Sequence, residues 1–234
     1  MPPKPYVPTG LAEVDRVDGI VAPTLQDYVT AASDYVVNRS GVGNEQAKAA
    51  QIRLSRALAR FLANDLNRHV PGLGAAAGEI KIAGGLRTMN SDVTAVHPLD
   101  GVRLAVEIKP VNLAVGRAIW SRFGDIRAFG VNVHLKFPFA LVGGVLAIPT
   151  FEEGKGGSQR PTAHLIERAV LRLHRAGNRE KESDAPHLLE GVWVLVYDPT
   201  TAQVEANVPP GGYGLRYEEF VDNLVKAYEA RYVE

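Results

Sequence analysis

Apolar residues recur along much of this chain at the spacing of three and four positions that is typical of amphipathic helices. The longest such stretch carries a single apolar stripe, formed by Leu54, Leu58, Phe61, Leu62 and Leu66. Asn44 precedes it and is a residue type that commonly caps a helix. The pattern therefore predicts several helices. Their ranges are 25–38, 45–68, 112–129, 161–176 and 217–232.

Other segments alternate between apolar and polar residues or form short apolar runs, which is typical of strands. Gly84-Gly85 and residues 98–101 supply turns between the first three of these segments. We therefore expect three consecutive strands and further strands later in the chain. Their ranges are 79–82, 92–97, 102–108, 131–137, 140–148, 192–197 and 203–208.

The predicted elements follow one another as helix, three strands, helix and strand, with C-terminal helices and strands added. This order indicates an α/β fold in which helices flank a central mixed sheet. Residues 1–24 are rich in proline and show little periodicity, so we expect an extended N-terminal arm. Residues 25–234 are expected to form one domain.

Composition limits the classes of function. Of the 234 residues, 46% are hydrophobic and 22% charged, which is ordinary for a globular protein. Lys plus Arg and Asp plus Glu both number 26, so a basic surface requires local clustering. The chain has no cysteine, which excludes disulfides and cysteine zinc sites. The longest apolar run, 137–149, is too short to span a membrane, and no signal peptide is recognisable, so we expect a cytoplasmic protein.

The residues that carry chemistry lie on two neighbouring predicted strands. Asp92 begins one strand, and Glu107 and Lys109 lie near the end of the next. Residues i and i+2 of a strand face the same side, so Glu107 and Lys109 point together while Ile108 points into the core. A hairpin through residues 98–101 brings Asp92 beside them. Two carboxylates at one sheet edge suit Mg²⁺, and an adjacent ammonium can stabilise charge that develops on phosphorus.

The sequence NSDV at 90–93, followed by EIKP at 107–110, resembles the motif of the PD-(D/E)XK, or restriction-endonuclease-like, superfamily. Members of this superfamily share a core of helix, three strands, helix and strand, and the resemblance covers about residues 44–148. It implies that Asp92 and Glu107 bind Mg²⁺, for which Mn²⁺ substitutes, and that Lys109 acts on the attacking water or the scissile phosphate. Ser91 stands where the family usually has proline.

An acidic residue two positions before a lysine is a weak signal by itself, because the chain contains three such pairs. The pair in 153–155 lies in a glycine-rich loop, and the pair in 79–81 has no upstream acid on a neighbouring strand. Only the pair at Glu107 has one. The alternative is a surface Glu–Lys contact without a catalytic role. Glu79 is the preferred further catalytic acid, ahead of Glu45 at a helix start.

Side chains that could hold DNA follow the acid–lysine pair. Arg117 and Arg122 lie on the next predicted helix, and Asn132, His134 and Lys136 share the polar face of the predicted strand after it. Such donors suit contacts to phosphates or base edges. An ordinary half-solvated strand is the alternative interpretation.

Together these features predict a Mg²⁺-dependent endonuclease that hydrolyses double-stranded DNA, most similar to a type II restriction enzyme. No ATPase signature is visible, so no nucleotide cofactor is expected. A homodimer is expected, because cutting both strands usually takes two active sites. One alternative is a repair or mobile-element nuclease that reads DNA structure. Another is a non-catalytic nucleic-acid-binding module in which the strand acids are structural.

Overall fold

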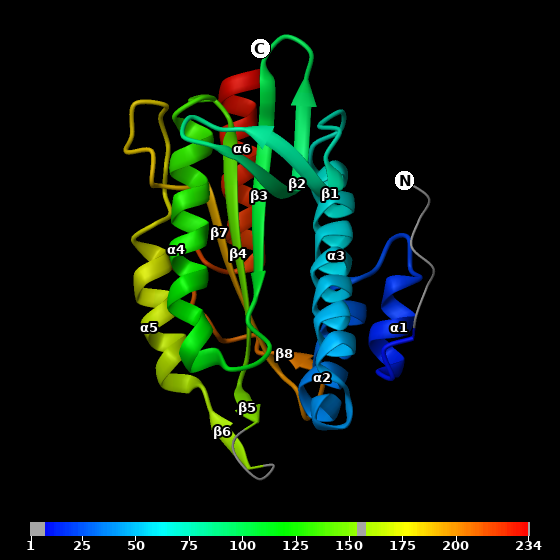
Figure 1. Cartoon of the computed structure of the whole chain (residues 1–234). Helices are drawn as coiled ribbons and strands as arrows, with labels where there is room; N and C mark the ends of the chain where they lie inside the picture. Colours follow the sequence, from blue (N-terminus) through cyan, green and yellow to red (C-terminus); the bar gives the residue numbers. More distant parts are fainter. Residues whose placement is uncertain (1–7, 154–157, 234) are drawn as a thin grey trace.

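The computed structural model of the chain describes residues 8–153 and 158–233. Within these residues, six strands form a central mixed sheet (Figure 1). In their spatial order they are β1 (Ala76–Ala83), β2 (Thr88–His97), β3 (Gly101–Pro110), β4 (Leu141–Pro149), β7 (Gly191–Asp198) and β8 (Gln203–Val204). Strands β1, β2 and β3 pair antiparallel, β3, β4 and β7 pair parallel, and β8 pairs antiparallel with β7. The predicted α/β fold with a mixed sheet is therefore confirmed.

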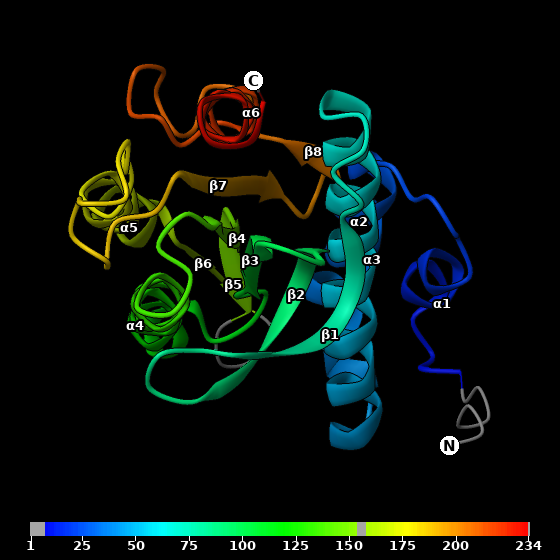
Figure 2. The same ribbon diagram turned by 90° about the horizontal axis from the view of Figure 1, so that it is seen from above.

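Helices cover both faces of this sheet (Figure 2). The α-helices of the described residues are α1 (Ala12–Asp18), α2 (Leu25–Asn38), α3 (Asn44–His69), α4 (Val115–His134), α5 (Ala163–His174) and α6 (Tyr217–Tyr232), and α1 packs against α2 and α3. A separate two-stranded hairpin pairs β5 (Phe151–Glu153) with β6 (Gln159–Pro161). The order α3-β1-β2-β3-α4-β4 follows the order expected from the sequence. None of the helices in the described ranges is both long and apolar enough to cross a membrane.

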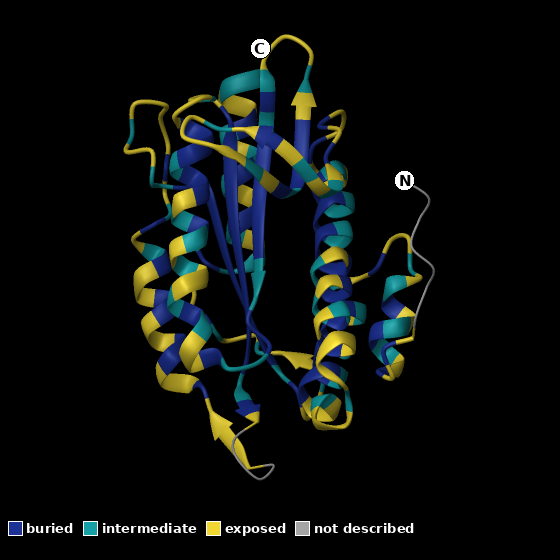
Figure 3. Cartoon of the chain, viewed as in Figure 1, coloured by how far each residue is buried: buried dark blue, intermediate teal, exposed yellow. Residues whose placement is uncertain are grey.

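Two hydrophobic layers, one on each face of the sheet, hold the fold together. On β3, Leu104, Val106 and Ile108 pack into the layer formed with α1, α2, α3 and α6, whereas Ala105 faces the layer formed with α4 and α5. Strands β4 and β7 are buried along nearly their whole length (Figure 3). Burying a side chain of leucine size stabilises the folded state by about 1.5–3 kcal/mol, so these layers fix where each strand lies.

The predicted strand at 131–137 is wrong, because these residues continue and then leave helix α4. Their alternation of apolar and polar residues resembles a strand. However, Ile126, Phe129 and Val133 are buried at helical spacing, so a helical stripe runs into this stretch from α4 and packs on the sheet. Tertiary packing therefore favours the helix, and the polar residues at 132, 134 and 136 do not share a strand face.

The predicted extended arm at 1–24 is also wrong over the residues that the structure describes there. Helix α1 lies within it and contacts α2 and α3. Leu11, Val14 and Val17 are almost fully buried at a spacing of three, so one side of this short helix joins the core. Residues 1–7 of the predicted arm lie outside the described residues.

A buried ionic cluster ties the C-terminal helix to the sheet. The side chain of Glu190 is fully buried and contacts Arg179 Nη1 at 2.7 Å, Arg231 Nη1 at 2.8 Å and His134 Nε2 at 3.2 Å. It also accepts the backbone N–H of Val142 at 2.7 Å. Burial alone raises the pKa of Glu190, but His134, Arg231 and the Val142 N–H together lower this pKa below its usual range. Glu190 is therefore held as a carboxylate among surplus cations.

We predict that Glu190→Gln destabilises the protein by about 3 kcal/mol at neutral pH, because it leaves two buried guanidinium groups without a counter-charge. Urea unfolding would measure the change. Glu180→Gln, at an exposed residue next to Arg179, is the control and should change stability by less than about 0.5 kcal/mol. Equal stability of Glu190→Gln and wild type would contradict the role given to this cluster.

Candidate active site

The structure brings together the three residues that the sequence motif singled out. Val93 of β2 pairs with Val106 of β3, so Asp92 and Glu107 occupy the next positions on these neighbouring strands. Glu107 and Lys109 lie two positions apart on β3 and form an ion pair. Ile108 between them is 2% exposed and packs into the opposite layer. The predicted arrangement of these side chains is confirmed.

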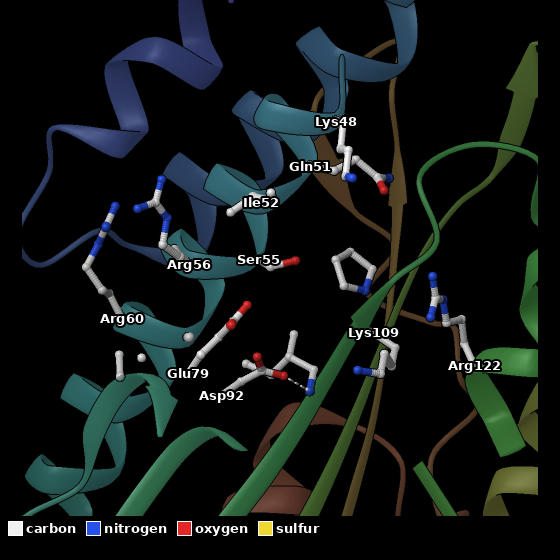
Figure 4. A pocket seen from close by; sticks show the side chains of 15 residues that line it. Lys48, Gln51, Ile52, Ser55, Arg56, Arg60, Glu79, Asp92, Lys109 and Arg122 are labelled. Atoms are coloured by element: carbon white, nitrogen blue, oxygen red, sulfur yellow. Dashed lines mark hydrogen bonds between the residues drawn. The ribbon is translucent and has the colours of Figure 1, made fainter. Parts of the chain in front are cut away.

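Hydrogen bonds fix Asp92 where the regular pairing of β2 with β3 ends. Asp92 Oδ2 accepts the backbone N–H of Ile108 at 2.7 Å, so a side chain takes the place of a backbone acceptor (Figure 4). Ser91 is fully buried, and its hydroxyl lies 2.9 Å from the carbonyl oxygen of Val93 and 3.3 Å from that of Val106. The strand before the acid is thus anchored by a serine.

A β-bulge in β1 faces Asp92. Ala77 pairs with Val93 and Ile80 pairs with Ser91, so the two residues Gly78 and Glu79 together oppose Asp92. Gly78 has a φ of 145°, a backbone conformation that residues other than glycine rarely adopt. Bulges of this kind occur preferentially next to active sites, where they redirect side chains. Here the bulge brings Glu79, which is exposed and accepts a hydrogen bond from Asn90 at 3.3 Å, to the edge of the acid pair.

The electrostatic environment of the two acids is unusual for strand residues. Burial raises the pKa of Glu107 to about 7, although the ion pair with Lys109 acts in the opposite direction. Burial also raises the pKa of Asp92, against the Ile108 hydrogen bond and the charge of Lys109. Desolvation disfavours the charged form of a carboxyl group, and carboxyl groups shifted in this way gather at functional sites.

Two hollows meet at these residues. One, of about 410 Å³, lies between α3 and β3, and the other, of about 330 Å³, lies beside β2 and α4. Glu79, Asp92 and Lys109 line both hollows, and Glu107 lines the second. Figure 4 shows Asp92 and Lys109 beside the first hollow, across from Ser55 of α3. A chain-like ligand can therefore reach the acids from two sides.

The side chains near Asp92 and Glu107 limit which kind of metal site can form there. Among the described residues, no group of three or more His, Cys, Asp or Glu side chains is placed to hold a metal ion. Mg²⁺ usually keeps several waters and takes one or two protein carboxylates together with substrate phosphate oxygens. Asp92 and Glu107 fit that mode of binding as adjacent, partly desolvated oxygen donors. A closed site made of protein ligands alone does not fit.

Other predicted site residues lie elsewhere. Asn132 is buried and its amide oxygen accepts the N–H groups of Leu86 and Arg87, which fixes the turn between β1 and β2. His134 is buried against Glu190. Lys136 is exposed just beyond α4, over the ring of Phe137. The prediction that residues 132, 134 and 136 form one DNA-binding face is therefore wrong, because Asn132 and His134 are buried within α4 and only Lys136 is exposed.

The two arginines of α4 are separated by the structure. Arg122 lines the first hollow, beside Lys109. Arg117 lies in the first turn of α4 and lines a third hollow with Arg39 and Arg160, which contains neither acid of the pair. Glu45, in the first turn of α3, lines none of these hollows. Only Arg122 of the two is placed beside the candidate active site.

Sequence reasoning missed the side of α3 that faces the acids. Lys48, Gln51 and Ser55 line the first hollow. They are three and four positions apart, so they form a second stripe along the helix. This spacing was enough to predict a polar surface. Which element that surface faces depends on tertiary packing, and the sequence pattern does not encode it.

Comparison of the chain with family models, with curated proteins and with solved structures found no match. Inferences about this site therefore depend on its own geometry and on the motif resemblance.

We predict that Glu107→Gln stabilises the protein at alkaline pH in the presence of EDTA. The folded state keeps a proton on Glu107 up to about pH 7, whereas the unfolded chain loses it near 4.5. Stability therefore falls as pH rises between these values and stays lower above them. The variant should exceed wild type by about 3 kcal/mol at high pH and by little in acid.

Urea unfolding across this pH range would measure the difference. Glu167→Gln, on the exposed side of α5, is the control and should not change the pH dependence. If Glu107→Gln were less stable than wild type at high pH, Glu107 would be a structural ion-pair partner of Lys109 and not a strained functional acid.

Proposed function

We propose that this protein is a Mg²⁺-dependent endonuclease that hydrolyses double-stranded DNA, with a restriction-endonuclease-like core over about residues 44–148. The observation that carries the proposal is the placement of Asp92, Glu107 and Lys109 on adjacent strands between two open hollows. The order α3-β1-β2-β3-α4-β4 agrees with the core order that the motif resemblance implies. Neither feature alone is specific, but the motif occupies the expected strands of that order.

In this proposal Asp92 and Glu107 hold the cation, with Mn²⁺ able to replace Mg²⁺. A cation held there would supply polarisation of the phosphodiester and a more acidic attacking water. Asp92 keeps its orientation through the Ile108 N–H, so its other oxygen is directed to the ligand. The Lys109 ammonium, steered by Glu107, orients the water or donates to the scissile phosphate. The oxygen of the water forms a bond to phosphorus and the bond from phosphorus to one sugar oxygen breaks. The water gives up a proton and the departing sugar oxygen takes one up, which leaves a phosphomonoester at one new end and a hydroxyl at the other.

Cutting inside a strand requires that nucleic acid extends to both sides of the reacting phosphate. The two hollows that share Glu79, Asp92 and Lys109 support this requirement. They favour an endonuclease over an enzyme that removes single nucleotides from an end. A type II restriction enzyme is the preferred kind, acting as a homodimer so that each strand meets one active site.

One observation favours a second candidate function. Lys109 forms an ion pair with Glu107, as a structural contact between two strand residues would. The acids would then be structural, and the protein would be a non-catalytic nucleic-acid-binding module. Metal dependence separates these two functions.

We predict that the wild-type protein cleaves plasmid or phage DNA only when Mg²⁺ or Mn²⁺ is present. Asp92→Asn and Lys109→Ala should each lower the rate at least about 100-fold, because the first removes a charged ligand of the cation and the second removes the ammonium that acts on the water or the phosphate. Gel analysis of the products measures this. Discrete fragments indicate sequence recognition, whereas cutting confined to branched or nicked DNA indicates a nuclease that reads DNA structure.

The chain supplies a matched control for Lys109. Lys81 belongs to a second acid-x-lysine sequence, on the edge strand β1, and its side chain is exposed. The Lys81→Ala protein should cleave DNA at the wild-type rate. Absence of cleavage of every form of DNA with both cations would contradict the proposed function and favour the binding module.

We also predict that Mg²⁺ or Mn²⁺ raises the Tm of the wild-type protein by roughly 5–10 °C at a cation concentration about 100 times Kd, since only the folded state presents both carboxylates. Differential scanning fluorimetry measures the shift. Asp92→Asn should lose it, and Glu45→Gln should retain it. An equal shift in Asp92→Asn and wild type would place the cation elsewhere.

A further inference from the structure

The first hollow has a strongly basic lining outside the acid pair. Cationic side chains reach it from three elements: Lys48, Arg56 and Arg60 from α3, Lys109 from β3, and Arg122 from α4. Glu79 and Asp92 are the acids of its lining. A chain whose formal net charge is zero thus concentrates positive charge beside its most unusual carboxylates.

The arginines of α3 are already engaged by helix α1. Asp18 lies 3.5 Å from Arg53, 3.6 Å from Arg56 and 3.8 Å from Arg60, and Asp15 pairs with Arg53 at 2.7 Å. Arg60 also donates to the carbonyl oxygens of residues 17 and 18. These contacts make the arginines part of the α1–α3 interface.

A different side of α3 is not engaged in this way. Lys48, Gln51 and Ser55 line the hollow, and in the described ranges none of their side chains has a hydrogen-bond or ion-pair partner. Figure 4 shows them on α3 across the hollow from Lys109, while Arg56 and Arg60 extend toward α1. Arg122 faces them from α4, and its own partner, Asp125 at 3.0 Å, is an exposed contact of little strength.

We propose that this side of α3, with Arg122 opposite, binds the sugar–phosphate backbone of the DNA strand next to the scissile phosphate; the proposal rests on the function proposed above. Lys48 supplies a charge contact, and Gln51 and Ser55 donate hydrogen bonds to phosphate oxygens. These side-chain types position a nucleic acid without reading its bases. Specificity then has to come from other surfaces.

The dimensions agree with a backbone track. Seven residues separate Lys48 from Ser55, which is about 10 Å along a helix axis. Each strand of duplex DNA advances about 3.4 Å per nucleotide along its axis, so this span corresponds to about three nucleotides. The stripe therefore covers the strand that flanks the acids and not a single nucleotide.

The test measures binding without catalysis. Anisotropy of a labelled random-sequence duplex, in EDTA, gives Kd for the full-length protein over a series of salt concentrations. Lys48→Ala and Arg122→Ala should each reduce the slope of log K against log salt by about 0.9, which is about an eightfold loss of affinity at 0.1 M salt. Ser55→Ala should weaken binding about threefold to tenfold without changing the slope.

Arg68→Ala is the matched control, because Arg68 lies on the same helix, is 72% exposed and is outside the hollow. It should bind like wild type, and circular dichroism confirms that each variant is folded. Unchanged slopes in Lys48→Ala and Arg122→Ala, or no binding of DNA by wild type, would overturn the backbone track. Reduced slopes together with absent cleavage in Mg²⁺ would support the track and overturn the nuclease.

Discussion

The hydrogen bond from the Ile108 N–H to the carboxylate of Asp92 is the interaction on which the site depends. A strand residue normally pairs its backbone with a neighbouring strand, and a carboxylate that takes over one of these bonds needs room in the ladder. The bulge at Gly78-Glu79 on one side and the buried hydroxyl of Ser91 on the other supply this room. The pairing of β2 with β3 makes Asp92 and Glu107 neighbours, and the bulge brings Glu79 of β1 to the same edge.

Two buried glutamates in this protein show how environment separates structure from chemistry. Glu190 is surrounded by Arg179, Arg231 and His134, and its pKa is lowered despite full burial. Glu107 has one cationic partner, Lys109, and its pKa is raised to about 7 by burial. A buried carboxylate with too few cationic partners destabilises the folded protein when no ligand is bound. A carboxylate with too few cationic partners favours binding of a cation or another positive ligand. The small number of cationic partners at Glu107 therefore suits a binding role, whereas the several partners of Glu190 suit a stabilising one.

The sequence predicts the acid pair and the order of the core helices and strands along the chain well, because strand alternation and turn residues act locally. It fails where two local patterns compete. Residues 131–137 satisfy both a strand alternation and a helical stripe, and packing against the sheet selects the helix. Helix α1 was hidden by the surrounding prolines, although Leu11, Val14 and Val17 have helical spacing. Which side of α3 faces Asp92 is a tertiary property, so Lys48, Gln51 and Ser55 could not be assigned to the site from their spacing.

Helix α1 also explains how a chain without net charge can present a directed positive surface. Asp15 and Asp18 neutralise the arginines on one side of α3, whereas Lys48 on another side has no acidic partner in the described ranges. Electrostatic attraction of a polyanion depends on the local field, which is screened over about 8–10 Å at physiological salt, more than on the sum of charges. Lys48 of α3 therefore adds a positive charge, unpaired among the described residues, to the hollow that Asp92 and Lys109 line. Net charge is a poor guide to nucleic-acid binding when the acids of one helix, here α1, neutralise the arginines on one side of another helix, here α3.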